Sequence, residues 1–171
     1  VVDLIEEGYD LGIRIGALPD SASLVARRLG LQTMGIGASP AYIAAHGRPQ
    51  TLDEMRQHVG VAYARGGVEK GWSLMEADGE VVQLRVPPRL RMDDLQAIAD
   101  AAIAGAGLAW LPCWMLSHYV RTGELDVLMH GDRMAAQPVH AVWPQARYLP
   151  SKTRTAIDAL AERVPAMLAT W

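Results

Sequence analysis

Arg14 and Gly16 are the first residues in the chain whose types and spacing could bind a ligand. They end a stretch, Leu11 to Gly16, in which apolar residues alternate with small or charged ones, the period of a β-strand. Ligands of open α/β sheets bind at the carboxyl ends of strands. A guanidinium there can hold a carboxylate through two parallel hydrogen bonds, and a glycine allows close approach to the backbone. The alternative role of Arg14 is a salt bridge to a neighbouring acid.

Met92, Asp93 and Asp94 form a second candidate anion site. The sequence predicts that Asp93 opens a helix and that Gln96, three residues on, acts as its reciprocal cap. The free N–H groups and the dipole at such a helix start attract an anion. Asp93 can cap its own helix while the backbone faces a ligand, so both roles are compatible.

Other patterns that suggest chemistry have structural explanations. Ser39 lies in Gly-Ala-Ser-Pro-Ala, but the following Pro40 has no N–H for an oxyanion hole, so Ser39 is predicted to cap a helix. The segment 105–107 is a helix stop, and Cys113 is a small buried hydrophobe. The histidines lack the spacing of a helical zinc site and are assigned surface or cap roles: His46, His58, His118, His130 and His140. We therefore expect no catalytic residue, no metal site, no cofactor and no enzyme activity.

The composition indicates a folded globular protein. Of its 171 residues half are apolar and 20% are charged. The net charge is −3 and no basic run is longer than Arg27-Arg28, so the chain by itself is not expected to bind nucleic acid. A single cysteine suits a reducing cytoplasm. Glycines and a proline interrupt the longest uncharged run, residues 101–116, which argues against a membrane span.

Strands and helices are expected to alternate along the chain. The first strand leads into a turn at Pro19-Asp20, and the last helix presents one apolar face with charged residues outward. This alternation favours parallel α/β layers. The predicted strands cover residues 11–16, 25–31, 34–38, 59–64, 72–75, 81–86, 108–111 and 139–143. The predicted helices start near residues 40, 51, 93 and 114, and a last helix includes residues 154–168.

The ordered set of motifs resembles the effector-binding domain of LysR-type transcriptional regulators across essentially the whole chain. The motifs are GYDLGIRIGALPDSASLVARRLGLQTMGIGASPAYIAAHGRP, then TLDEMRQH, DDLQAIADAAIAGAGLAWLP and PVHAVWPQARYLPSKTRTAIDALAER. None of them is specific alone, but their order is that of the family.

The resemblance implies an α/β fold like that of type II periplasmic solute-binding proteins, with two lobes joined by two crossover strands. On this pattern residues 1–29 and 144–171 form the first lobe, and residues 30–143 form a complete second lobe. Such domains open with a strand–helix–strand unit, which would precede Val1. The first lobe is therefore expected to be incomplete.

The resemblance also implies which residues contact an effector. Family sites use the loop at the Met92-Asp93-Asp94 helix start, the region after Leu111-Pro112 and the crossover at Trp143. Together with the strand end described above, the predicted ligand-binding residues are Arg14, Gly16, Met92, Asp93, Asp94, Pro112 and Trp143. Arg14 and the helix start favour a small carboxylate or another anion.

The implied function is the effector-sensing domain of a bacterial transcription factor, which binds a small metabolite between its lobes and thereby modulates transcription. The implied partners are the metabolite and a second copy of the domain, paired through the helix Ser39–His46, within a tetrameric parent. DNA would be bound only through an absent N-terminal domain, and no membrane is involved. A periplasmic solute-binding protein of a transport system is the alternative, and a signal peptide upstream would distinguish it.

Overall fold

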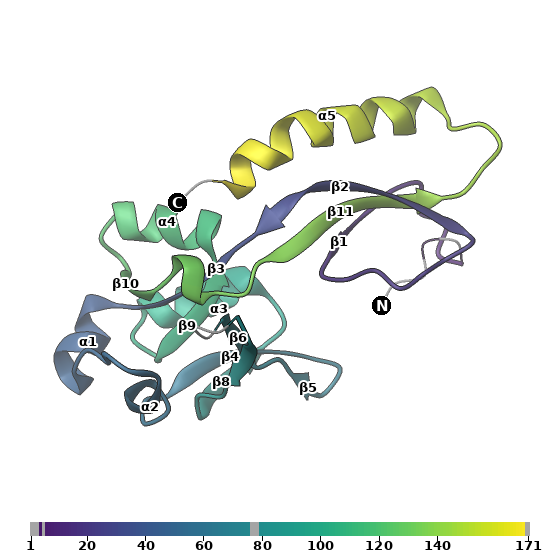
Figure 1. Ribbon diagram of the computed structural model, residues 1–171. Coiled ribbons are helices and arrows are strands. Elements are labelled where there is room, and N and C mark those ends of the chain that lie inside the picture. The colour runs from purple at the N-terminus through teal and green to yellow at the C-terminus, as the bar shows by residue number, and fades with distance from the viewer. Residues whose placement is uncertain (1–3, 5, 76–78, 170–171) are drawn as a thin grey trace. The chain divides into compact units, whose positions relative to one another are not determined.

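The computed structural model describes residue 4, residues 6–75 and residues 79–169 (Figure 1). Within it the chain divides into two compact units, and we consider each by itself. Unit 1 consists of Val1–Gln32 and Ala136–Thr170, and unit 2 contains Thr33–Ala135. The lobe boundaries expected at 29/30 and 143/144 fall inside the strands β2 and β11 of unit 1. The helical face predicted over residues 1–5 lies mostly outside the described residues.

Unit 1 is a three-stranded antiparallel sheet with one long helix. Its strands are β1 (Gly12–Ile15), β2 (Leu24–Gln32) and β11 (Gln137–Pro144), in the order β1-β11-β2. The helix α5 (Ser151–Leu168) lies along β2 (Figure 1). Its predicted apolar face is confirmed, since Ile157 and Leu168 are buried while Arg154 and Asp158 are exposed. A bulge at Leu29 interrupts the β2–β11 register next to Gly30.

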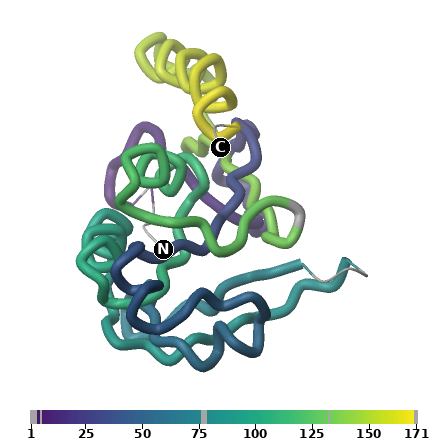
Figure 2. Tube along the Cα trace, turned by 90° about the vertical axis from the view of Figure 1, so that its left-hand side faces the viewer, coloured from purple at the N-terminus to yellow at the C-terminus, as the bar shows by residue number. Residues whose placement is uncertain are grey.

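Unit 2 has a six-stranded sheet with a separate hairpin. The sheet order is β10-β3-β9-β4-β5, and β8 also pairs with β4. Figure 2 shows β6 and β7, which pair antiparallel, running side by side. The strands are β3 (Met34–Ala38), β4 (Gly60–Arg65), β5 (Val68–Glu69), β6 (Trp72–Met75), β7 (Val81–Leu84), β8 (Pro88–Met92), β9 (Leu108–Pro112) and β10 (Asp126–Met129).

The helices of unit 2 cover both faces of this sheet. On one face α1 (Pro40–His46), α2 (Leu52–Met55) and the hairpin enclose a core around Ile36, Leu108 and Trp110. On the other face α3 (Leu95–Ile103) and α4 (Cys113–Arg121) enclose a core around Val61, Ala109 and Leu111. A short 3₁₀ helix, η1 (Gly131–Arg133), follows β10. Successive side chains of a strand point to opposite faces of the sheet and therefore pack in two separate cores.

The prediction of a parallel sheet is wrong in part, because the sheet of unit 2 is mixed. Strands β8 and β9 both run parallel to β4, but β3 runs antiparallel to its neighbours β9 and β10. Parallel neighbours need a crossover that usually contains a helix. Strand β3 follows directly on β2, without a helix between them. No helical crossover therefore sets β3 parallel to β9 or β10, and it runs antiparallel to both.

Candidate functional site

Arg14 and Gly16 lie at the end of β1, as the alternation from Leu11 predicted. Gly16 has φ +102°, and its N–H donates to the carbonyl of Pro138 at 2.9 Å. No heavy atom lies within 4 Å of the position that a Cβ would take at Gly16. A ligand can therefore approach the backbone at this strand end.

His140 is a further candidate site residue, and its predicted surface or cap role is wrong, because it lies partly buried within strand β11. It stands opposite Arg14 on β1 and opposite Arg28 on β2, so the three side chains form a row across one face of the sheet. The Nδ1 atom of His140 is buried, and it has no hydrogen-bond partner among the described residues. Buried polar atoms in native proteins are almost always paired. This nitrogen, on a residue whose strand neighbours are both arginines, is thus the strongest local indication of a ligand in unit 1.

Trp143 lies on the opposite face of the same sheet. It is three residues beyond His140 on β11 and pairs with Val25, on the face where Arg27 contacts Asp158 of α5 at 2.8 Å. The structure therefore separates Trp143 from the row that contains Arg14. The indole of Trp143 is half-buried.

The remaining predicted residues meet at one edge of the unit 2 sheet. Met92 ends β8 and Pro112 ends β9, and both strands run parallel to β4 between them. Their carboxyl ends therefore share an edge, where ligands of α/β sheets bind. Asp93 and Asp94 follow Met92 directly and are exposed, whereas Pro112 is buried.

The predicted cap of the following helix is wrong by one residue. Asp94, and not Asp93, is the N-cap of α3, because its Oδ1 accepts the N–H of Ala97 at 2.8 Å. Gln96 does not return to the cap, since its Nε2 donates to Asp100 at 2.8 Å and to the hydroxyl of Tyr119 at 2.6 Å. Asp93 has no capping role, and its exposed carboxylate counts against an anion at this point.

Cys113 follows the same strand edge and is buried, as predicted. Burial raises the pKa of its thiol above the ordinary value, and a side-chain hydrogen bond with Thr33 opposes this to a smaller extent. A thiol with a raised pKa is a poor nucleophile at neutral pH. The packing interpretation of this cysteine is therefore supported.

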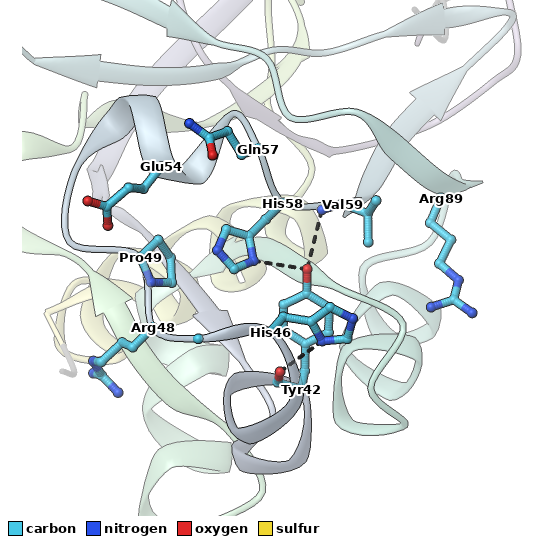
Figure 3. Close-up of a pocket in the computed structure, with 10 residues that line it drawn as sticks. Tyr42, His46, Arg48, Pro49, Glu54, Gln57, His58, Val59 and Arg89 are labelled. Atoms are coloured by element: carbon cyan, nitrogen blue, oxygen red, sulfur yellow. Dashed lines mark hydrogen bonds between the residues drawn. The ribbon is translucent and has the colours of Figure 1, made fainter.

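A separate pocket of about 760 Å³ opens on unit 2, between α1, α2 and the starts of β4 and β8 (Figure 3). The buried Tyr42 lies at its centre, with its ring stacked on His46 at a centroid distance of 4.2 Å. The Tyr42 hydroxyl accepts the N–H of Val59 at 3.3 Å and lies 3.1 Å from Nδ1 of His58. No sequence pattern indicated this pocket, because its residues come from four elements.

Within the part of the chain that the structure describes, no group of three or more His, Cys, Asp or Glu side chains is placed to hold a metal ion. No described helix combines the length and the apolar character that crossing a membrane requires.

Comparison with known proteins decides the family. The model for the LysR substrate binding domain matches residues 1–165. The chain belongs to this family. Because these domains are parts of transcription factors and not of enzymes, the family assignment confirms the prediction that the chain is not an enzyme.

Curated relatives agree with this LysR assignment. An uncharacterized HTH-type transcriptional regulator of Haemophilus influenzae is 33% identical over 88% of this chain and 52% of its own length. The HTH-type transcriptional activator AaeR of Escherichia coli is 30% identical over 94% of this chain and 51% of its own length. The chain thus spans about half the length of these relatives. Since both are transcription regulators, we do not carry the transport alternative further.

Solved structures agree on the fold. The regulatory domain of CrgA, a LysR-type regulator of Neisseria meningitidis, has a TM-score of 0.77 and 25% identity, covering 92% of this chain and 76% of that domain. The effector domain of AmpR of Pseudomonas aeruginosa has a TM-score of 0.70 over 99% of this chain and 77% of that domain, at 20% identity. The mixed α/β fold is therefore that of LysR regulatory domains, which bind small-molecule effectors.

Proposed function

We propose that this chain is the effector-sensing domain of a cytoplasmic LysR-type transcription factor, and that a small organic anion is its effector. The match to the LysR substrate binding domain over residues 1–165 carries the proposal. In the parent protein the effector would bind between two lobes and shift the arrangement of a tetramer on DNA. DNA would be contacted by an N-terminal domain outside this sequence.

The anionic character of the effector is supported by unit 1. Arg14 and Arg28 flank the buried, unpaired Nδ1 of His140 on one face of the sheet, and the backbone at Gly16 is open. A carboxylate can accept hydrogen bonds from a guanidinium and from an imidazole N–H together. We propose that the anionic group of the effector contacts this row and that an uncharged part of it contacts the sheet edge at Met92, Asp93, Asp94 and Pro112. Trp143, on the other sheet face, is retained as a proposed contact with less support.

A metabolite screen on the complete reading frame that contains this chain tests the proposal. A ligand that binds the folded state increases the free energy of unfolding, by about 2.7 kcal/mol at a ligand concentration a hundredfold above Kd. The melting temperature therefore rises. We expect one or more organic acids to raise Tm. The same acids should change transcription of a reporter that is driven by the promoter adjacent to the regulator's gene. A reading frame with a signal peptide and no helix-turn-helix would contradict the proposal.

His140→Leu refines that test, because it removes the unpaired nitrogen and keeps an apolar side chain of comparable size. Replacing an unsatisfied buried polar group by an apolar one is close to neutral or stabilising. We therefore expect an unchanged or raised Tm without effector and a weaker Tm shift with it. An unchanged shift would remove His140 from the binding site.

A further inference from the structure

The Tyr42 pocket lies at the opposite end of the unit 2 sheet from the proposed effector contacts. Val59 directly precedes β4, and Arg89 is the second residue of β8. Met92 and Pro112 stand where β8 and β9 end. The pocket volume of about 760 Å³ falls in the range of about 300–1,000 Å³ that is usual for small-molecule sites. This pocket is therefore distinct from the site proposed above.

Tyr42 fixes two imidazole rings at the rim of this pocket. Its backbone carbonyl lies 3.0 Å from Nδ1 of His46, and because a carbonyl only accepts, that nitrogen carries a proton. The Tyr42 hydroxyl accepts from Val59 and lies 3.1 Å from Nδ1 of His58, so this ring too is held by a hydrogen bond with Tyr42. Two rings are thus held in place before any ligand arrives.

The charges around the pocket are unevenly compensated. Arg48 donates to Asp126 at 3.2 Å and to the carbonyl of Val127, so its guanidinium is engaged. Arg89 has neither an ion pair nor a hydrogen bond within the described ranges. Figure 3 shows Arg89 on the side of the His46 ring and Glu54 on the far side of His58, where Glu54 accepts the N–H of Gln50 at 2.6 Å. The Arg89 side is therefore the cationic one.

We propose that this pocket is a second ligand site, which binds a small planar organic oxyanion, either a carboxylate or a phosphate ester. Arg89, on the cationic side of the pocket, would hold the anionic group by charge-assisted hydrogen bonds. The exposed His46 ring, stacked on Tyr42 through one face, offers its other face to a planar group. The proposal does not depend on the identity of the effector in unit 1.

Histidine NMR signals of the 171-residue chain provide a local test. The chain is labelled with ¹³C-histidine, the signals are assigned with His46→Gln and His58→Gln, and benzoate or phenyl phosphate is titrated, with benzyl alcohol as the neutral probe. We expect saturable shifts of the His46 and His58 signals with at least one anion and none with benzyl alcohol. The anion that acts separates a carboxylate site from a phosphate site. Absence of a shift with both anions, or an equal shift with benzyl alcohol, overturns the proposal.

Arg89→Gln and Arg91→Gln make a matched pair of variants. Both residues are exposed and belong to β8, but Arg91 pairs with Glu69 at 3.0 Å and does not line the pocket. We expect Arg89→Gln to weaken anion binding by about tenfold or more, and Arg91→Gln to leave it unchanged. Circular dichroism verifies that each variant is folded. Equal affinities of Arg89→Gln and the unchanged chain would overturn the proposal, and Arg14→Ala should leave these signals unaffected.

Discussion

Arg14 offers the most direct residue-scale test of the proposed effector site. It shares a sheet face with His140 and stands beside the open backbone of Gly16. If it holds an anionic effector, Arg14→Ala should weaken the response by about ten- to a hundredfold, because a hydrogen bond to a charged group contributes about 1.5–3 kcal/mol. DNA affinity of the parent regulator should remain, since DNA would contact another domain. Effector half-saturation and melting temperature are measured on one variant.

Arg27→Ala is the matched control for that variant. Arg27 lies on the other face of the same sheet and pairs with Asp158 of α5, where both side chains are largely exposed. Exposed ion pairs contribute little, so the variant should change neither stability by more than about 1 kcal/mol nor effector half-saturation. If Arg14→Ala instead lowers Tm and spares half-saturation, Arg14 is a structural residue.

The Cys113 thiol gives the stability of the chain a pH dependence of known sign. Burial raises its pKa above the ordinary 9.0 in the folded state. Below that pH the thiol is protonated in both states and contributes nothing; above it the unfolded thiol ionises first, so the free energy of unfolding falls. We expect this loss in urea titrations between about pH 8 and about pH 10, and its absence in Cys113→Ala. Equal slopes in the two chains would contradict the burial effect.

Capping residues were well predicted from sequence because their hydrogen bonds are local. Ser39 accepts the N–H of Tyr42 at 3.3 Å and Thr51 accepts that of Glu54 at 3.2 Å, as expected. The return hydrogen bond of this capping box differs from the expected one, because the Glu54 carboxylate accepts the N–H of Gln50 and not that of Thr51. His140 and the Tyr42 pocket were missed because their environment depends on strand register and on residues far apart in sequence.

At the scale of elements, glycines in β3 determine how closely α4 packs on the sheet. A Cβ at Gly37 would lie 2.7 Å from Cδ1 of the fully buried Leu116, and one at Gly35 would lie 2.7 Å from its Cδ2. Contacts this short force a packed core to shift. Side chains at both positions would therefore displace the helix.

Gly37→Ala should accordingly destabilise unit 2 by about 1–3 kcal/mol. Leu116→Ala alone should cost about 2–5 kcal/mol, because it leaves a cavity. In the double variant the new methyl group occupies part of that cavity, so the loss should be smaller than the sum of the two. Urea unfolding of the three variants measures this coupling, and additive losses would show that Gly37 and Leu116 are not in contact.

Elements with a clear period were predicted nearly to their ends, whereas atypical ones were missed. The period-two stretch of β1 and the apolar face of α5 are examples of the first kind. Strand β8 was missed although Pro88, Leu90 and Met92 alternate with Arg89 and Arg91, because the segment is short, begins at a proline and has no β-branched or aromatic residue. It forms because β4 supplies a parallel partner, which no local pattern indicates.

At the scale of the molecule, the order of motifs predicted the family, but individual strands gave the sheet directions incorrectly. The predicted ligand residues lie in two separate units: Arg14, Gly16 and Trp143 in unit 1, and Met92, Asp93, Asp94 and Pro112 in unit 2. A local sequence pattern can predict the element that carries each of them, but it does not predict which residues of different elements come together.

The sheet of unit 1 is covered unevenly by its helix. Residues of β11 on the α5 face are buried, with Ala141 0% and Val139 3% exposed. Their partners on β1, Ile13 and Ile15, are on the same face but 48% and 51% exposed. In the described part of the chain β1 pairs only with β11, so its outer edge has no strand neighbour. We propose that a further strand and helix, encoded upstream of Val1, cover this edge and face.

Hydrogen exchange on two chain lengths tests that proposal. An unpaired edge with exposed isoleucines exchanges its amide hydrogens fast and promotes association. In a longer chain that includes the upstream residues, the amides of Gly12–Ile15 should exchange more slowly than in the 171-residue chain, while those of the central strand β9 should not change. Ile13→Thr with Ile15→Thr should make the short chain less prone to aggregate but destabilise the long one, because only there do the two side chains become buried. Equal exchange at β1 in both lengths would mean that the upstream segment lies elsewhere.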